Sequence, residues 1–182
     1  MTACRALVAD PPWRFKDRLP GKRRGAARNY PTLSVEQIKA FPLPSLEADA
    51  ILFLWRVSSM VEEAYAVARA WGFSPKSEIV WEKTTKSGKP HFGMGRYVRA
   101  SHETCILATR GRMSHRLRSR SVRSVFKAPV GRHSEKPDAF YALVEQLVDG
   151  PFVELFARRE RAGWSCFGNE VAVAAPEGGS KC

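Results

Sequence analysis

The stretch that most constrains the fold is the uninterrupted apolar run at residues 50–55 (AILFLW). A strand without a polar side has no face to turn toward water, so it has to lie inside a sheet that is covered on both faces. Sheets of this kind are mostly parallel, and their strands are joined by helices that pack on the two faces. The run therefore predicts an α/β fold.

Shorter patterns predict the elements around this strand. Capping boxes at residues 34–37 and 59–62 begin two helices, which we expect to end near residues 41 and 71. Pro137 favours a third helix, ended by Gly150. Further strands are expected at 6–9, 78–81, 104–108, 122–127, 152–156 and 164–167. The order predicts one doubly wound, mostly parallel sheet over residues 1–170, followed by a disordered tail at 171–182.

The segment Asp10-Pro11-Pro12-Trp13 directly follows the strand expected at 6–9. Proline fixes its own φ and pushes the preceding residue into an extended conformation, so this segment is rigid. A carboxylate and two backbone carbonyls are then held at the carboxyl end of a strand, where α/β sheets bind their ligands. Several hydrogen-bond acceptors beside an aromatic ring suit a flat, proton-donating amine.

The net charge of +12 is concentrated in two segments. Residues 14–28 contain one acidic residue and residues 110–132 contain none. Each segment could be a solvated loop, but two acid-poor segments together favour a polyanion, and we predict nucleic acid as the partner. The cations are Arg14, Lys16, Arg18, Lys22, Arg23, Arg24 and Arg28 in the first segment, and Arg110, Arg112, Arg116, Arg118, Arg120, Arg123, Lys127 and Arg132 in the second.

Other classes of site are not indicated by the sequence. Its four cysteines are scattered without a C-x-x-C pair, and its four histidines show no metal-ligand spacing, so we expect no metal site. This cysteine usage fits a reducing cytoplasm. No apolar run approaches the ~18–20 residues of a membrane span, and the chain starts without a signal-peptide pattern.

The segment at residues 10–13 resembles the D/N-P-P-Y/W signature of amino methyltransferases that use S-adenosylmethionine. Its Asp-first, Trp-last form is similar to that of the MT-A70 family of N6-adenine methyltransferases. The resemblance implies a Rossmann-like class I methyltransferase fold in which the proline motif precedes the cofactor strand, a permuted order. Further similar stretches follow in family order at 30–32 (YPT), 93–97 (GMGRY), 102–105 (HETC), 134–138 (SEKPD), 154–158 (ELFAR) and 164–170 (WSCFGNE).

The resemblance assigns the chemistry to the proline motif. Asp10 and the carbonyl of Pro11 or Pro12 would accept hydrogen bonds from the adenine N6 amine and orient it for in-line attack. Trp13 and Tyr30 would form walls for the extruded base. Trp13 taken alone is also typical of a core aromatic residue.

The resemblance also implies where the cofactor, S-adenosyl-L-methionine, binds. Phe156 and Arg158 would flank its nucleoside, although Phe156 also fits an ordinary core position. Asn169 and Glu170 would bind the ribose hydroxyls, with Glu170 standing where the family usually has Gln. The remaining family positions, near the target adenine or the cofactor carboxylate, are Glu103, Ser134 and Lys136; Asp10 also belongs to the cofactor set.

Two further departures concern the cofactor pocket. Larger family members contact the cofactor adenine with an acidic and apolar pair upstream of the strand that leads into the proline motif. Only nine residues precede Asp10 here, so we expect that contact to come from elsewhere or to be missing. The Pro-His-Asn that often follows the family's arginine is replaced by residues 159–161 (RER).

The resemblance therefore implies an enzyme that methylates the N6 amine of adenine in DNA, similar to the compact microbial and phage-type members of the family and working in the cytoplasm of a bacterial or phage-infected cell. Arg116, Arg118 and Arg120 are expected to bind substrate phosphates. RNA methylation is the near alternative, because one pocket would serve either nucleic acid. A non-catalytic nucleic-acid-binding subunit and a protein glutamine methyltransferase stay open, and so does a homodimer.

Overall fold

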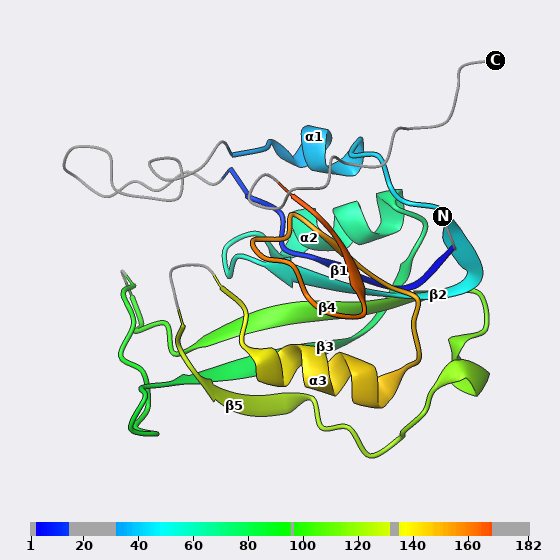
Figure 1. Ribbon diagram of the computed structural model, residues 1–182. Helices are drawn as coiled ribbons and strands as arrows, with labels where there is room; N and C mark the ends of the chain where they lie inside the picture. Colours follow the sequence, from blue (N-terminus) through cyan, green and yellow to red (C-terminus); the bar gives the residue numbers. More distant parts are fainter. Residues whose placement is uncertain (1–2, 15–31, 96, 132–134, 169–182) are drawn as a thin grey trace.

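The computed structural model describes residues 3–14, 32–95, 97–131 and 135–168. Seven strands in these ranges form one sheet, in the order β5-β3-β4-β2-β1-β6-β7 (Figure 1). The strands are β1 (Cys4–Ala9), β2 (Leu46–Arg56), β3 (Ser74–Thr84), β4 (His102–Arg110), β5 (Val125–Pro129), β6 (Phe152–Leu155) and β7 (Trp164–Phe167). The helices are α1 (Val35–Lys39), α2 (Val61–Ala70), α3 (Asp138–Leu147) and a short 3₁₀ turn, η2 (Met113–Arg116).

All strand pairs are parallel except those of β4, which is antiparallel to both β2 and β3. This confirms the predicted α/β fold with a mostly parallel sheet. Because β4 is reversed, its first residue, His102, pairs with Glu82 near the carboxyl end of β3. Its last residue, Arg110, pairs with Ala50 in the first half of β2. The start of β4 therefore lies at the edge where the other strands end.

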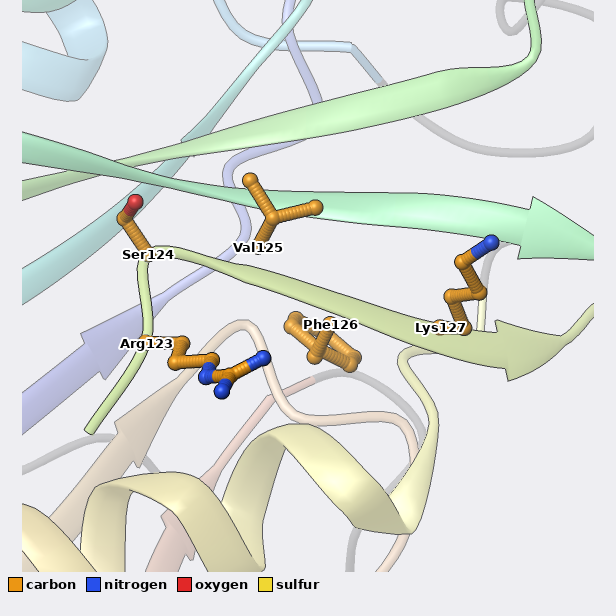
Figure 2. Close-up of a pocket in the computed structure, with 5 residues that line it drawn as sticks. All are labelled: Arg123, Ser124, Val125, Phe126 and Lys127. Carbon is orange, nitrogen blue, oxygen red and sulfur yellow. The ribbon is translucent and has the colours of Figure 1, made fainter. Parts of the chain in front are cut away.

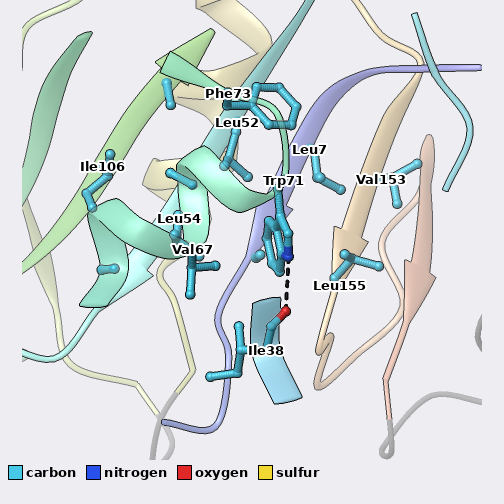
Figure 3. Packing of buried hydrophobic residues seen from close by; sticks show 14 of the residues in the cluster. Leu7, Ile38, Leu52, Leu54, Val67, Trp71, Phe73, Ile106, Val153 and Leu155 are labelled. Carbon is cyan, nitrogen blue, oxygen red and sulfur yellow. Dashed lines mark hydrogen bonds between the residues drawn. The ribbon is translucent and has the colours of Figure 1, made fainter. Parts of the chain in front are cut away.

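Helices α1 and α2 cover one face of the sheet and α3 covers the other (Figure 1). Alternate residues of β2 enter two separate cores: Leu52 and Leu54 join the α1/α2 side, whereas Phe53 and Trp55 join the α3 side. All four are essentially inaccessible, as expected for a strand buried on both faces. Figure 3 shows the α1/α2 core, where the Trp71 indole donates a hydrogen bond to a helix α1 carbonyl over 3.0 Å.

The helix starts test the two predicted capping boxes. The first is confirmed: Ser34 accepts from the Gln37 backbone N–H, and the Gln37 side chain accepts from Ser34. The second is wrong, since α2 starts at Val61, and its N-cap residue is Met60, which makes no side-chain cap hydrogen bond. Gly72, with φ of 81°, follows α2 as predicted.

Several element boundaries differ from the predicted ones. β2 and β3 extend beyond the apolar runs at 50–55 and 78–81, because cross-strand pairing continues through polar residues. β6 stops one residue early because Phe156 adopts φ of 62°. The predicted tail at 171–182 lies outside the described residues. In the described part, no helix is long and apolar enough to cross a membrane, and no cluster of ligating side chains could hold a metal ion.

Candidate active site at the carboxyl edge of the sheet

Residues from four separate segments meet at the carboxyl edge of the sheet. Asp10 follows β1, Glu103 is the second residue of the reversed β4, and Lys136 precedes α3. Phe156 follows β6, the neighbour of β1. The sheet order therefore brings together side chains that are as much as 146 positions apart in the sequence, from Asp10 to Phe156.

The proline segment is fixed by backbone hydrogen bonds. The Pro11 carbonyl accepts from the Trp13 N–H over 2.8 Å, and the Pro12 carbonyl accepts from the Leu33 N–H over 2.8 Å. The Trp13 ring is 3% exposed, and its indole donates to the Trp55 carbonyl over 3.0 Å. This placement matches the interpretation of Trp13 as a core aromatic residue, whose ring anchors the segment to β2. The carboxylate of Asp10 is thus presented by a rigid turn.

A chain of alternating charges runs from Asp10 into the sheet. The Lys136 ammonium lies 2.7 Å from Asp10 Oδ2 and 3.2 Å from Glu103 Oε2. The other Glu103 oxygen, Oε1, lies 2.6 Å from the Lys83 ammonium. Lys136 also sits over the Trp55 ring, 5.0 Å from its centroid. The sequence did not single out Lys83, because its place beside Glu103 depends on the pairing of β3 with β4, in which Trp81 is the partner of Glu103.

The charges in this chain keep one another ionised. Burial lowers the pKa of Lys136, but Asp10 and Glu103 outweigh it and hold the pKa above its ordinary value. Burial raises the pKa of Glu103, but Lys136 and Lys83 outweigh it and hold the pKa below its ordinary value. Two carboxylates and two ammonium groups balance in charge, so the cluster is a preorganised ionic surface at neutral pH.

A second buried polar group lies under the site. Glu154 is 6% exposed in the middle of β6, and the Tyr141 hydroxyl donates to its Oε1 over 2.7 Å. Burial raises the pKa of Glu154, which favours the protonated form more than in water. The guanidinium of Arg161 stacks on the Tyr141 ring, 3.6 Å from its centroid. The family-like stretch at 154–158 begins with this glutamate, but the sequence assigned it no role of its own.

Phe156 and Arg158, which the resemblance assigns to the cofactor nucleoside, follow the end of β6. Phe156 has φ of 62°, a left-handed conformation that costs a residue other than glycine roughly 1 kcal/mol or more. Its ring packs on Phe41 with the centroids 4.5 Å apart. At the end of β7, a Cβ added to Gly168 would lie 2.2 Å from the Ala157 carbonyl oxygen. A strained residue, Phe156, and a close backbone approach, at Gly168, therefore both occur beside Asp10.

Some predicted site residues are not brought to this edge. Arg116, Arg118 and Arg120 follow the end of β4, which lies at the opposite edge of the sheet from Asp10. They contact this chain: Arg116 lies 3.9 Å from an Asp49 oxygen, Arg118 lies 3.3 Å from Asp149, and Arg120 donates to the Ser114 carbonyl. Their role in binding phosphates stays a prediction. Tyr30, Ser134, Asn169 and Glu170 lie outside the described residues.

An open hollow of about 600 Å³ lies along β5, the outer strand of the sheet. It is lined by residues 123–127 (Figure 2). The Phe126 side chain points toward α3, where its ring centroid is 6.4 Å from that of Phe140, while Val125 points to the other face. Arg123 and Lys127 of the second basic segment line this hollow, but no residue that the family resemblance assigns to the site does, so we place the site at the carboxyl edge.

Comparison with known proteins settles the family. The MT-A70 family model matches residues 5–170. The chain belongs to the MT-A70 family. Methyltransferases of this family generally use S-adenosylmethionine.

The relatives of this MT-A70 family member differ in length. It is 28% identical to Type II methyltransferase M.MunI from a Mycoplasma species over 184 residues, which cover 91% of this chain and 76% of that protein. It is 28% identical to the human N(6)-adenosine-methyltransferase catalytic subunit METTL3 over 174 residues, covering 91% of this chain and 28% of that protein. An Arabidopsis thaliana N(6)-adenosine-methyltransferase MT-A70-like protein is 29% identical, with 23% of its length covered. The chain thus spans about a quarter of the length of these two eukaryotic relatives.

Proposed function

We propose that this protein is a methyltransferase that transfers a methyl group from S-adenosylmethionine to the N6 amine of adenine in DNA. The observation that carries the proposal is the geometry of Asp10. Its carboxylate lies between β1 and a rigid turn at the carboxyl edge and is anchored through Oδ2 to a buried lysine over 2.7 Å. An anchored acceptor costs little reorganisation when a proton-donating amine arrives.

The charges at the site fit the proposed cofactor. The methionine part of S-adenosylmethionine carries an ammonium and a carboxylate. The site offers both complements, since Lys136 is a buried cation and Asp10 and Glu103 are carboxylates within 3.2 Å of it. Phe156 follows β6, which lies two strands from β2 in the sheet. Its apolar ring can pack against the nucleoside part of the cofactor. We infer that Lys136 holds the carboxylate of the methionine part.

The residues of this chain would position the amine rather than attack anything themselves. When bound, the cofactor supplies an electrophilic methyl group on a sulfonium, so no nucleophilic side chain is required. Asp10 accepts a hydrogen bond from one N–H of the N6 amine. The Pro11 and Pro12 carbonyls each have a second lone pair, which can accept a hydrogen bond from the other N–H. Two acceptors orient the nitrogen lone pair toward the methyl group.

DNA is the preferred substrate because the chain covers much more of the Mycoplasma relative than of the human one. The Mycoplasma type II methyltransferase is matched over 76% of its length, whereas the human N(6)-adenosine enzyme is matched over 28%. RNA is the second candidate, because the sequence identity to the N(6)-adenosine enzymes is equally high. The same proposal assigns residues 1–170 to the methyltransferase domain, places the protein in the cytoplasm and allows a homodimer.

Transfer of tritiated methyl groups to DNA, RNA and protein in parallel tests this proposal. The labelled nucleic acid is digested and the modified nucleoside identified. We expect label on N6 of deoxyadenosine, and its loss in Asp10→Ala but not in Asp149→Ala, a carboxylate at the opposite edge. Label on RNA adenosine would move the substrate to RNA, and label on protein glutamine would refute adenine as the target. No label on any substrate would favour a non-catalytic nucleic-acid-binding subunit.

A further inference from the structure

The loop between β3 and β4 gathers most of the large exposed apolar side chains of the described residues. Six such side chains are exposed, and two of them, Val61 and Val125, stand alone elsewhere. Single exposed apolar residues are ordinary, whereas a cluster marks a contact surface. The other four, which we call the apolar tip, are Phe92, Met94, Tyr97 and Val98, exposed by 76%, 76%, 89% and 78%.

The apolar tip is carried by a tightly folded backbone. A Cβ on Gly93 would lie 2.0 Å from the Ala100 carbonyl oxygen, and one on Gly95 would lie 1.9 Å from the Val98 carbonyl oxygen. Only glycine allows backbone segments to approach this closely. The Ala100 N–H also donates to the Met94 carbonyl over 3.4 Å. The apolar side chains therefore project from a compact turn.

The base of the same loop belongs to the candidate active site. The Lys83 N–H donates to the Ser101 carbonyl over 2.8 Å, and the Lys83 carbonyl accepts from the His91 N–H over 3.0 Å. The Lys83 ammonium binds Glu103, which contacts Lys136. The loop leaves the sheet at the carboxyl edge (Figure 1), the same edge at which we place the target adenine.

The charge of the loop indicates what its apolar tip contacts. Residues 83–102 contain no acidic residue. The Arg99 guanidinium lies over the Phe92 ring, 5.0 Å from its centroid, so a cation and an aromatic ring are presented together. Aromatic side chains interleaved with cations are typical of surfaces that stack on bases and follow a phosphate backbone. The five cations of this stretch are Lys83, Lys86, Lys89, Arg96 and Arg99.

We propose that the apolar tip inserts into the base stack of duplex nucleic acid and holds it open beside the target base. Only the identity of the target base, adenine, rests on the proposed function. In a duplex the N6 amine of adenine is paired, so the base must leave the stack to reach Asp10. Apolar side chains that enter a base step unstack it and kink the duplex. The exposed Lys86, Lys89 and Arg99 contact the flanking phosphates.

The first test measures duplex distortion without any chemistry. Closed circular plasmid is relaxed by a topoisomerase in the presence of the protein, and the change in linking number per bound protein is measured. We expect a change with the native protein and the loss of most of it in a Phe92→Ser, Met94→Ser, Val98→Ser triple variant at matched occupancy. Val125→Ser, an exposed apolar residue outside the loop, should behave as the native protein does.

The second test compares methyl transfer to genomic DNA before and after heat denaturation. The triple variant should lose about tenfold or more on duplex DNA and much less on denatured DNA, where no stack has to be opened. The inference would be overturned if the triple variant unwound DNA as much as the native protein does, or if it lost equal methyl transfer on duplex and denatured DNA. Unwinding without methyl transfer by the native protein would refute the proposed function and keep the inference, and transfer without unwinding would do the reverse.

Discussion

Replacing Lys136 with Met removes the cation between two carboxylates and keeps a side chain of similar length. Breaking a buried ion pair by removing one partner costs about 3–5 kcal/mol. The Asp10 and Glu103 side chains keep 17% and 31% of their exposure, and Glu103 keeps Lys83 at 2.6 Å. Water and Lys83 therefore relieve part of the cost, and we expect the free energy of unfolding to fall by about 2–3 kcal/mol.

For a chain of 182 residues this corresponds to a melting temperature lower by roughly 5–10 °C at pH 7. The measurements are urea denaturation and thermal melting of the two proteins. Lys127→Met is the matched control, because Lys127 pairs with Glu82 over 3.1 Å but is 69% exposed. An exposed pair of this kind contributes about 0–1 kcal/mol. The double variant Lys136→Met, Asp10→Asn should recover part of the loss.

The difference in the free energy of unfolding between the native protein and Lys136→Met, which we call the gap, should depend on pH. The native pKa of Glu103 is below its ordinary value of 4.5, so its stabilising contribution is present above that value and is lost as the pH falls through the native pKa. The native pKa of Lys136 is above its ordinary value of 10.5, so its contribution is lost as the pH rises through the native pKa. The gap should be widest near neutrality and shrink below pH 4.5, where the stabilising contribution of Glu103 is lost. A gap that is absent, or equal at pH 4 and 7, would refute the ionic chain.

The remaining predictions concern chemistry, backbone packing and substrate binding. Asp10→Ala should reduce methyl transfer by about 10²-fold or more with the far-ultraviolet circular dichroism unchanged, and near-native turnover would exclude the proline motif from the mechanism. Gly168→Ala should destabilise the protein by roughly 2 kcal/mol in urea denaturation, because its Cβ would lie 2.2 Å from the Ala157 oxygen; a neutral result would contradict that close approach. Replacing Arg116, Arg118 and Arg120 with Gln should lower the slope of log affinity against log salt by about 0.7–0.9 per lost phosphate contact, with cofactor affinity unchanged. An unchanged slope in anisotropy titrations would mean that these arginines do not contact phosphates and serve only in contacts within this chain.

The sequence predicted what depends on local pattern. The run at 50–55 predicted a strand buried on both faces, and Leu52 and Phe53 do enter opposite cores. Ser34 predicted a helix start because its capping box is complete within four residues. Ser59 has the same pattern but gives no cap, because the packing of Met60 into the α1/α2 core sets that helix start.

What the sequence could not predict depends on strand order. Nothing in residues 104–108 marks their strand as reversed, because antiparallel and parallel buried strands have the same apolar pattern. The direction of β4 decides both that Glu103 meets Lys136 and that Arg116 lies at the opposite edge. The family resemblance supplied Glu103 and Lys136 as site residues, but their contact with Lys83 follows from the fold alone.

The reversal of β4 also makes one loop interchangeable. In a purely parallel sheet, a connection has to return across a face of the sheet, so its length is bound to the packing of a helix. The β3–β4 connection instead leaves and re-enters the sheet at the carboxyl edge, and the described core does not include it. Residues 85–101 can therefore be exchanged for a loop of another length or chemistry while β3 and β4 keep their pairing. Grafting this loop between MT-A70 proteins would transplant a substrate preference as a module, without redesign of the catalytic scaffold.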